Sequence, residues 1–114
     1  MEKPQFKLNG RVWIETANGK VLGHGRIELL ERIHASGSIR QAALQMKMSY
    51  KQAWDLIHHI NENFAEPMVI SHRGGKGGGK AEVTEKGFKA IAQFHALQQQ
   101  LNEFLITHVS DLDL

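Results

Sequence analysis

The stretch from Gly37 to Asn61, GSIRQAALQMKMSYKQAWDLIHHIN, decides the fold. It contains two helical patterns separated by a short break, and Ser38 and Ser49 stand where each helix would need an N-cap. The apolar positions recur three or four residues apart, at Ile39, Ala42, Ala43 and Met46 in the first helix and at Ala53, Ile57, Ile60 and Phe64 in the second. Two short helices joined by a tight turn are typical of a helix-turn-helix, whose second helix enters the DNA major groove.

The outward positions of the second helix are the candidate base-reading residues. Gln52 is suited to adenine, and Lys51 to guanine or a phosphate. Asp55 could accept a hydrogen bond from cytosine, but at one turn beyond Lys51 we expect it to orient that lysine. Together with the start of the preceding helix, the predicted DNA contacts of this region are Ser38, Arg40, Ser49, Tyr50, Lys51, Gln52, Trp54, Asp55 and His58.

Two aromatic residues in this set have a second interpretation. Tyr50 and Trp54 lie beside the apolar stripe, so either could be partly core, and for Trp54 we expect packing to be its main role. His58 and His59 suggest a metal site, but adjacent helical residues diverge by about 100° and cannot chelate one ion. The chain has no cysteine, so a metal site with thiolate ligands is not possible. We expect no metal, no cofactor and no catalytic residues.

Pro67 ends the helical region, and two short strands, residues 67–71 and 80–84, follow on either side of a loop. The loop belongs to the segment SHRGGKGGGKAEVT, residues 71–84, which is rich in glycine and basic residues. A phosphate-binding loop of nucleotide enzymes would need a hydroxyl after Lys80 and a helix starting there, whereas Ala81 and a strand follow. A simple linker would not explain the flanking strands. We predict the wing of a winged helix-turn-helix, with Arg73, Lys76 and Lys80 contacting phosphates.

The two ends of the chain complete the predicted organisation. Residues 6–23 should form a β-hairpin around a type I′ turn at Asn18-Gly19. A first helix follows at residues 26–37, within a helix-turn-helix and wing region spanning residues 26–84. Thr84 then caps a long helix, residues 85–109, which is about 36 Å long and longer than the domain needs. We expect this helix to form a dimer, although it could instead cover the N-terminal hairpin.

Composition places few further limits on the class of protein. With 114 residues, of which 41% are hydrophobic, the chain is expected to form a single α+β domain, residues 1–114, that is mainly α with small β-hairpins. The net charge is +2, with basic residues concentrated in the middle and acidic residues toward the C-terminus, which favours an anionic partner near the middle. No apolar run approaches the roughly 20 residues of a membrane span, so we expect no membrane contact and a cytoplasmic location.

Two motifs, MSYKQAW from Met48 to Trp54 and GGKGGGKAEVT from Gly74 to Thr84, make the chain resemble a known family. From Arg26 to Leu105 it is similar to the N-terminal, LysR-type winged helix-turn-helix domain of the molybdate-responsive ModE regulators. The resemblance implies a dimer formed by the first and last helices, bound to a palindromic operator through residues 49–55 and the wing, residues 73–80. ModE proteins also carry C-terminal domains that bind molybdate. Because 114 residues leave no room for them, we expect a single-domain member without its own molybdate site, or a sensor supplied elsewhere.

Together these observations predict a dimeric, sequence-specific DNA-binding transcription regulator that is not an enzyme. The alternative is a protein-interaction module, in which the winged helix docks onto another protein and the wing is unused. A small enzyme that binds a nucleotide at the glycine loop is a third alternative. Sensitivity to salt distinguishes them, because only binding to a nucleic acid should weaken steeply with ionic strength.

Overall fold

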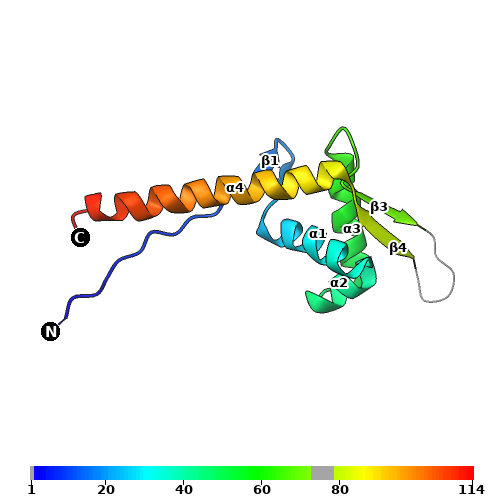
Figure 1. Ribbon diagram of the computed structural model, residues 1–114, viewed down its shortest axis with the longest axis horizontal. Coiled ribbons are helices and arrows are strands. Elements are labelled where there is room, and N and C mark those ends of the chain that lie inside the picture. The colour runs from blue at the N-terminus through cyan, green and yellow to red at the C-terminus, as the bar shows by residue number, and fades with distance from the viewer. Residues whose placement is uncertain (1, 73–78) are drawn as a thin grey trace.

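The computed structural model describes residues 2–72 and 79–114, in which helices and two small antiparallel hairpins form a mixed α+β fold (Figure 1). Arg73 and Lys76, two of the three predicted wing contacts, lie outside the described residues. The elements in chain order are β1 (Ile14–Thr16), β2 (Gly19–Leu22), α1 (His24–Ser36), α2 (Ile39–Gln45), α3 (Tyr50–Glu62), β3 (Val69–His72), β4 (Lys80–Val83), α4 (Glu85–His108) and a short 3-10 turn, η1 (Val109–Asp111).

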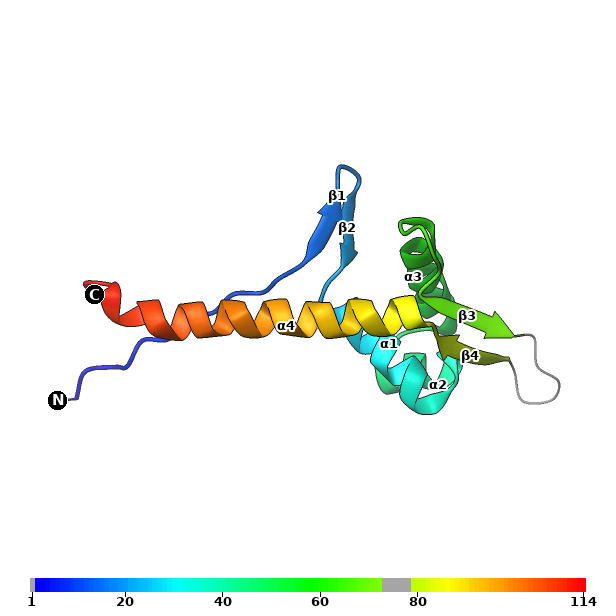
Figure 2. The same ribbon diagram turned by 45° about the horizontal axis from the view of Figure 1, so that its top comes forward.

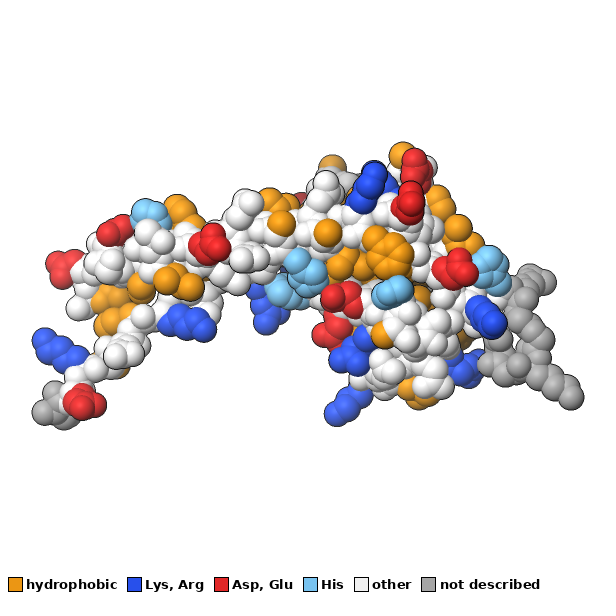
Figure 3. Space-filling view, in the orientation of Figure 1, with side chains coloured by type: hydrophobic (Ala, Val, Ile, Leu, Met, Phe, Trp, Pro, Cys, Tyr) orange, Lys and Arg blue, Asp and Glu red, His pale blue; other side chains and the backbone are white. Residues whose placement is uncertain are grey.

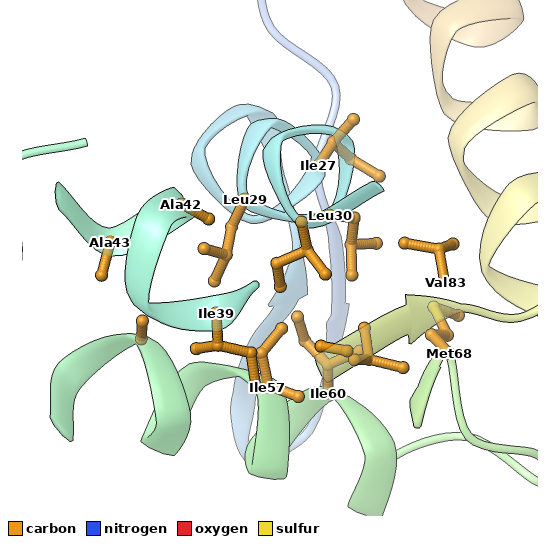
Figure 4. Packing of buried hydrophobic residues seen from close by; sticks show 14 of the residues in the cluster. Ile27, Leu29, Leu30, Ile39, Ala42, Ala43, Ile57, Ile60, Met68 and Val83 are labelled. Carbon is orange, nitrogen blue, oxygen red and sulfur yellow. The ribbon is translucent and has the colours of Figure 1, made fainter. Parts of the chain in front are cut away.

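The core lies where α1, α2, α3 and the hairpin β3–β4 meet (Figure 4). Leu30 and Ile33 of α1 are fully buried, and Ile60 of α3 faces Leu30 from the opposite side. Phe94, the largest fully buried side chain, attaches α4 to this core. The apolar spacing that predicted the helices therefore also predicts which faces of α1, α2 and α3 are buried.

Four of the predicted helix boundaries are confirmed by their capping geometry. The side chains of Ser38, Ser49 and Thr84 each accept a hydrogen bond from the backbone N–H three residues later. Gly37 ends α1 with a φ of 71°, a left-handed conformation that costs a glycine little. Because caps act within one turn of the chain, the local sequence is sufficient to predict them.

The predicted turn of the N-terminal hairpin is wrong by one position. Thr16 pairs with Gly19, so the two turn residues are Ala17 and Asn18 rather than Asn18 and Gly19. A type I′ turn needs positive φ at both central residues, whereas in this hairpin only Gly19, at 123°, has one. The register of the hairpin also shifts between Ile14 and Glu15.

The molecule is elongated, with extents of 63 × 33 × 24 Å, because α4 continues far beyond the core. An extended N-terminal segment runs back along the far half of α4 (Figures 1 and 2). Buried Gln98 holds it there: its side chain accepts a hydrogen bond from the backbone N–H of Val12 (2.9 Å) and donates one to the carbonyl of Gly10 (3.0 Å). Among the described residues, no helix is both long and apolar enough to cross a membrane.

Candidate nucleic-acid interface

The turn between α2 and α3 determines how α3 is presented to solvent. Lys47 adopts a φ of 57°, which is unusual for a residue other than glycine. The backbone N–H of Met48 then donates back to the carbonyl of Ala43 over 3.0 Å, which closes the turn. Ala42, Ala43 and Ala53 are buried where the two helices touch, and their small side chains allow a close approach. The face of α3 that was predicted to point outward consequently does not pack against the core.

The first turn of α3 is exposed and lies next to Arg40. Ser49 caps the helix, with its Oγ 3.0 Å from the backbone nitrogen of Gln52, and the Gln52 side chain is exposed. Tyr50 is 46% exposed to solvent. The Arg40 guanidinium carbon stands 5.1 Å from the centre of the Tyr50 ring, which is a cation–π distance. An arginine from α2 and an aromatic ring from α3 therefore form one surface unit.

Lys51 and Asp55 form the predicted pair within one turn of α3. The Lys51 Nζ lies 2.9 Å from Asp55 Oδ2, and both side chains are mostly exposed. The hydrogen bond to Asp55, reinforced by the carboxylate's charge, raises the pKa of Lys51 above its ordinary value. Asp55 thus orients Lys51, and part of the lysine's charge is already balanced within the protein.

Trp54 is 44% exposed and lies outside the buried core, so the expectation that it mainly packs is wrong. Its ring stacks on that of His58, with centroids 5.1 Å apart and planes 11° from parallel. His58 in turn contacts Glu62 over 2.9 Å. The periodicity already placed Ala53 on the apolar stripe and Trp54 beside it, and it was the size of the indole that suggested burial.

The second hairpin lies beside α3 and carries the third predicted wing residue. Its strands pair in register from Val69 opposite Val83 to His72 opposite Lys80. Lys80 is exposed at the beginning of β4. The backbone N–H of Ala81 donates to the carbonyl of Gly37 over 2.9 Å and so attaches the hairpin to the link between α1 and α2. On the face drawn in Figure 3, Lys and Arg side chains gather around α2 and toward this hairpin.

Asn61 connects α3 to the second hairpin, a role that sequence reasoning missed. Its side chain donates to the carbonyl of Val69 (2.9 Å) and accepts from the backbone nitrogens of Met68 (2.8 Å) and Val69 (3.3 Å). Asparagine is suited to this because its amide group both donates and accepts. The sequence signal is weak: an asparagine near the end of a helix usually suggests only a cap.

His58 and His59, which suggest a metal site in the sequence, have different surroundings in the structure. Within residues 2–72 and 79–114, no three His, Asp or Glu side chains lie close enough together to hold a metal ion. His58 and His59 have separate partners, since His59 Nδ1 lies 2.7 Å from Arg26 Nη1. Burial lowers the pKa of Arg26, which also donates to the carbonyl of Val21. This contact serves to join β2, α1 and α3.

Comparison with known proteins finds relatives named for molybdenum transport, for molybdenum-pterin binding and for transcriptional regulation. The chain is 40% identical over 88 residues to the molybdenum transport protein ModE of Azotobacter vinelandii, covering 77% of this chain and 33% of that protein. It is 41% identical over 88 residues to the DNA-binding transcriptional dual regulator ModE of Escherichia coli K12, with the same coverage. It is 40% identical over 92 residues to the molybdenum-pterin-binding protein MopA of Rhodobacter capsulatus, covering 81% of this chain and 35% of that protein.

These similarities support a place for the chain in the ModE family. The chain spans about a third of the length of the relatives it matches. No protein-family model matches it.

Proposed function

Because the chain is similar to ModE regulators over 77% of its own length, we propose that it belongs to their family and is a DNA-binding transcription regulator. In this proposal α2 and α3 form a helix-turn-helix, the hairpin β3–β4 is its wing, and the whole is a winged helix-turn-helix of the LysR type. The protein acts as a homodimer on a palindromic operator in the cytoplasm, and it is not an enzyme. DNA binding is the one activity of the relatives that we assign to these 114 residues.

The observation that carries the proposal is the surface at the start of α3. Tyr50, Lys51 and Gln52 are exposed there on a helix whose other face is buried, and Ser49 caps it. A recognition helix reads bases with its N-terminal residues, so this is where such side chains are needed. Gln52 provides a bidentate amide for adenine, and the free N–H groups of the first turn can bind a phosphate.

The second hairpin supplies contacts that are independent of sequence. Lys80 is exposed at its described end, and Arg73 and Lys76 occupy the adjoining segment of the chain. Each phosphate that a cation neutralises adds about −0.9 to the slope of log K against log salt. The wing should therefore add affinity for all DNA sequences alike, while α3 selects among them.

A protein-interaction module is the second candidate, and the exposed aromatic residues favour it. Tyr50 and Trp54 are both more than 40% exposed, and such residues are enriched at protein interfaces. In that case the surface of α3 would bind another protein, and removal of charges from the wing would not matter. The two candidates differ in their dependence on salt and on the wing.

The experiment combines operator selection with a salt titration. Genomic fragments bound by the protein are first selected with and without molybdate, and the affinity for a selected fragment is then measured at salt concentrations from about 50 to about 200 mM. The test variant carries Lys76→Gln and Lys80→Gln. The matched control carries Lys3→Gln and Lys7→Gln, which removes the same charge from the exposed N-terminal segment.

We expect the wing variant to bind all DNA more weakly and with a flatter salt slope, by about 0.9 for each phosphate that it no longer neutralises. The control should behave as the unaltered protein does. Equal binding by the wing variant and the unaltered protein would contradict the wing assignment. If no fragment is selected and binding is insensitive to salt, the interaction module is the better description. A shift of the melting temperature by millimolar ATP or GTP would instead favour a nucleotide-binding enzyme.

A further inference from the structure

A small hollow lies on the surface where α2, α3 and β3 meet, and its volume is about 100 Å³. Ile39, Ile57 and Val69 line it, and all three are buried. Trp54 also lines it and is exposed, so its indole stands between the hollow and solvent. The three buried residues come from three different elements of the core, and the packing of these elements therefore fixes the shape of the hollow.

The polar side chains around the hollow are largely engaged with the protein itself. The amide of Asn61 bonds to the backbone of Val69, and His58 Nε2 contacts Glu62 over 2.9 Å. Ser71 adds a hydroxyl from β3. None of the described residues that line the hollow is Lys or Arg. A phosphate, which is bound through cations and free N–H donors, is a poor match for this lining, whereas a small apolar group is a good one.

The hollow is connected to the start of α3 by a row of rings. Tyr50, Trp54 and His58 are four residues apart, so their side chains lie along one face of the helix. The rings of Trp54 and His58 stack with their centroids 5.1 Å apart, which holds the indole at the edge of the hollow. The row thus leads from the first turn of α3, which is proposed to enter the major groove, to an apolar hollow beside the second hairpin.

We propose that the hollow receives the C5-methyl group of a thymine in the operator, with Trp54 packed against the edge of that base. This methyl is the apolar group that base pairs present in the major groove, and the other bases lack it. Its burial therefore selects thymine at one position of each half-site, in addition to the hydrogen bonds that Gln52 offers. The inference rests on the proposed function, in which α3 lies in the major groove, and it names a base that the site recognises.

The test removes the methyl group from the DNA and leaves base pairing unchanged. Each thymine of a selected operator fragment is replaced in turn by deoxyuridine, at the same position of both half-sites, and the affinity is measured by titration. Burial of one methyl corresponds to about a fourfold change in affinity, so we expect about a fifteenfold loss at one pair of positions. 5-Bromodeoxyuridine, whose bromine is close to a methyl group in size, should restore the affinity there.

Two protein variants show whether Trp54 is the residue that contacts the methyl group. Trp54→Ala should bind the unmodified fragment more weakly, and deoxyuridine at the sensitive positions should then change its affinity by less than about twofold. Trp13→Ala is the matched control, because it removes the same side chain from the N-terminal hairpin, where Trp13 is 50% exposed. The control should lose about fifteenfold, as the unaltered protein does. Circular dichroism of both variants shows whether the fold is retained.

Several results would overturn the inference and leave the proposed function standing. One is a selected fragment in which no thymine is sensitive to deoxyuridine, and another is a loss that bromine does not restore. An equal loss in Trp54→Ala and in the unaltered protein would show that the methyl group acts through the shape of the DNA. If no fragment is selected at all, the proposed function fails together with the inference, and the exposed Trp54 is better explained as part of a surface that binds another protein.

Discussion

Arg40 and Tyr50 come from different helices but form a single surface unit next to the proposed major-groove residues. We predict that they contribute to DNA affinity jointly, because the ring of Tyr50 orients the guanidinium 5.1 Å away. Arg40→Ala and Tyr50→Leu should each weaken binding, and the double variant should lose less than the sum, with a coupling energy of about 0.5–1 kcal/mol. Tyr50→Phe keeps the ring and should retain most of the coupling. Additive effects in this double-mutant cycle would show that the two residues act separately.

The charge of Lys51 is partly neutralised by Asp55. A substitution of Asp55, although it lies in the proposed DNA interface, should therefore strengthen binding. Asp55→Asn removes a negative charge from the proposed interface and weakens the hold on Lys51, so the pKa of Lys51 should fall toward its ordinary value. The lysine stays protonated at neutral pH and becomes free to reach a phosphate. We expect tighter DNA binding and a salt slope steeper by about 0.9 for each new phosphate contact.

The control for this prediction is Glu62→Gln, which removes an equal charge from the last turn of α3, where Glu62 contacts His58. It should change affinity much less, because that turn lies away from the start of the helix. Weaker binding by Asp55→Asn would indicate that Asp55 itself accepts a hydrogen bond from a base, which is the alternative role that its position also allows.

Features that depend on neighbours along the chain can be predicted at the residue scale, and those that depend on distant partners cannot. Ser49 and the Lys51–Asp55 pair act within one helical turn, and their positions are confirmed. The prediction that Trp54 mainly packs is wrong because it rested on the size of the indole and not on its position beside the apolar stripe. Gln98 bonds the backbone of Val12 across 86 positions of sequence, and no local pattern indicates such a contact.

At the scale of elements, Asn61 holds the second hairpin against α3, and its replacement should affect both stability and function. Asn61→Ala leaves two backbone N–H groups and one carbonyl without their side-chain partner in a partly buried place. We expect the free energy of unfolding to fall by about 1–3 kcal/mol, and thus a melting temperature lower by several degrees. Because the hairpin is then less firmly placed, DNA affinity should also fall at temperatures where the protein is still folded.

Asn63→Ala is the matched control, since Asn63 bonds locally to the carbonyl of His59 at the end of the same helix. It should cost less stability and leave DNA affinity unchanged. Equal effects of the two substitutions would mean that Asn61 merely stabilises the helix end. Thermal unfolding followed by circular dichroism, together with DNA titration at one fixed temperature, distinguishes the two outcomes.

The N-terminal hairpin shows where element-level prediction from sequence is weakest. The alternation of apolar and polar residues predicts the hairpin, and both strands are present. The turn is nevertheless displaced, because an Asn-Gly pair also suits a hairpin in which only the glycine has positive φ. The preference of an Asn-Gly pair for turns therefore limits where the turn can lie without fixing its position. Val21 and Leu22 are both buried, and we infer that their packing selects the register in which β1 pairs with β2.

At the scale of the whole molecule, the two halves of the long helix α4 pack against different parts of the chain. Its first half is packed on the core through Phe94, and its second half is covered on one side by the N-terminal segment, where Gly10 lies close to Leu101 and Leu105. The periodic stripe correctly predicts a helix, but it cannot separate Phe94, which is buried, from Phe104, which is exposed. That distinction depends on where the core ends, beyond which one face of α4 stays exposed.

A dimer joined through α4 should read DNA with a fixed spacing, and this is the prediction for the whole molecule. Two-fold symmetric proteins of this kind place their recognition helices in successive major grooves, about 34 Å or one helical turn apart. Inserting about 5 base pairs, half a helical turn, between the half-sites of a selected palindrome turns one half-site to the far side of the duplex. We expect affinity to fall to that of a single half-site, whereas inserting about 10 base pairs should restore the facing but not the distance, and so recover little.

Phe104→Ala, which shortens an exposed side chain in the far half of α4, provides the control for spacing. Where this substitution separates the two subunits, each should bind a half-site independently, so the affinity should be the same for the original palindrome and for the duplex with the insertion. The comparison separates two causes of weak binding, because a damaged DNA surface would lower affinity for a single half-site, whereas a broken dimer lowers only the advantage of having two. If the unaltered protein is itself insensitive to spacing, the two recognition helices are not held at a fixed distance, and α4 does not set the geometry of DNA recognition.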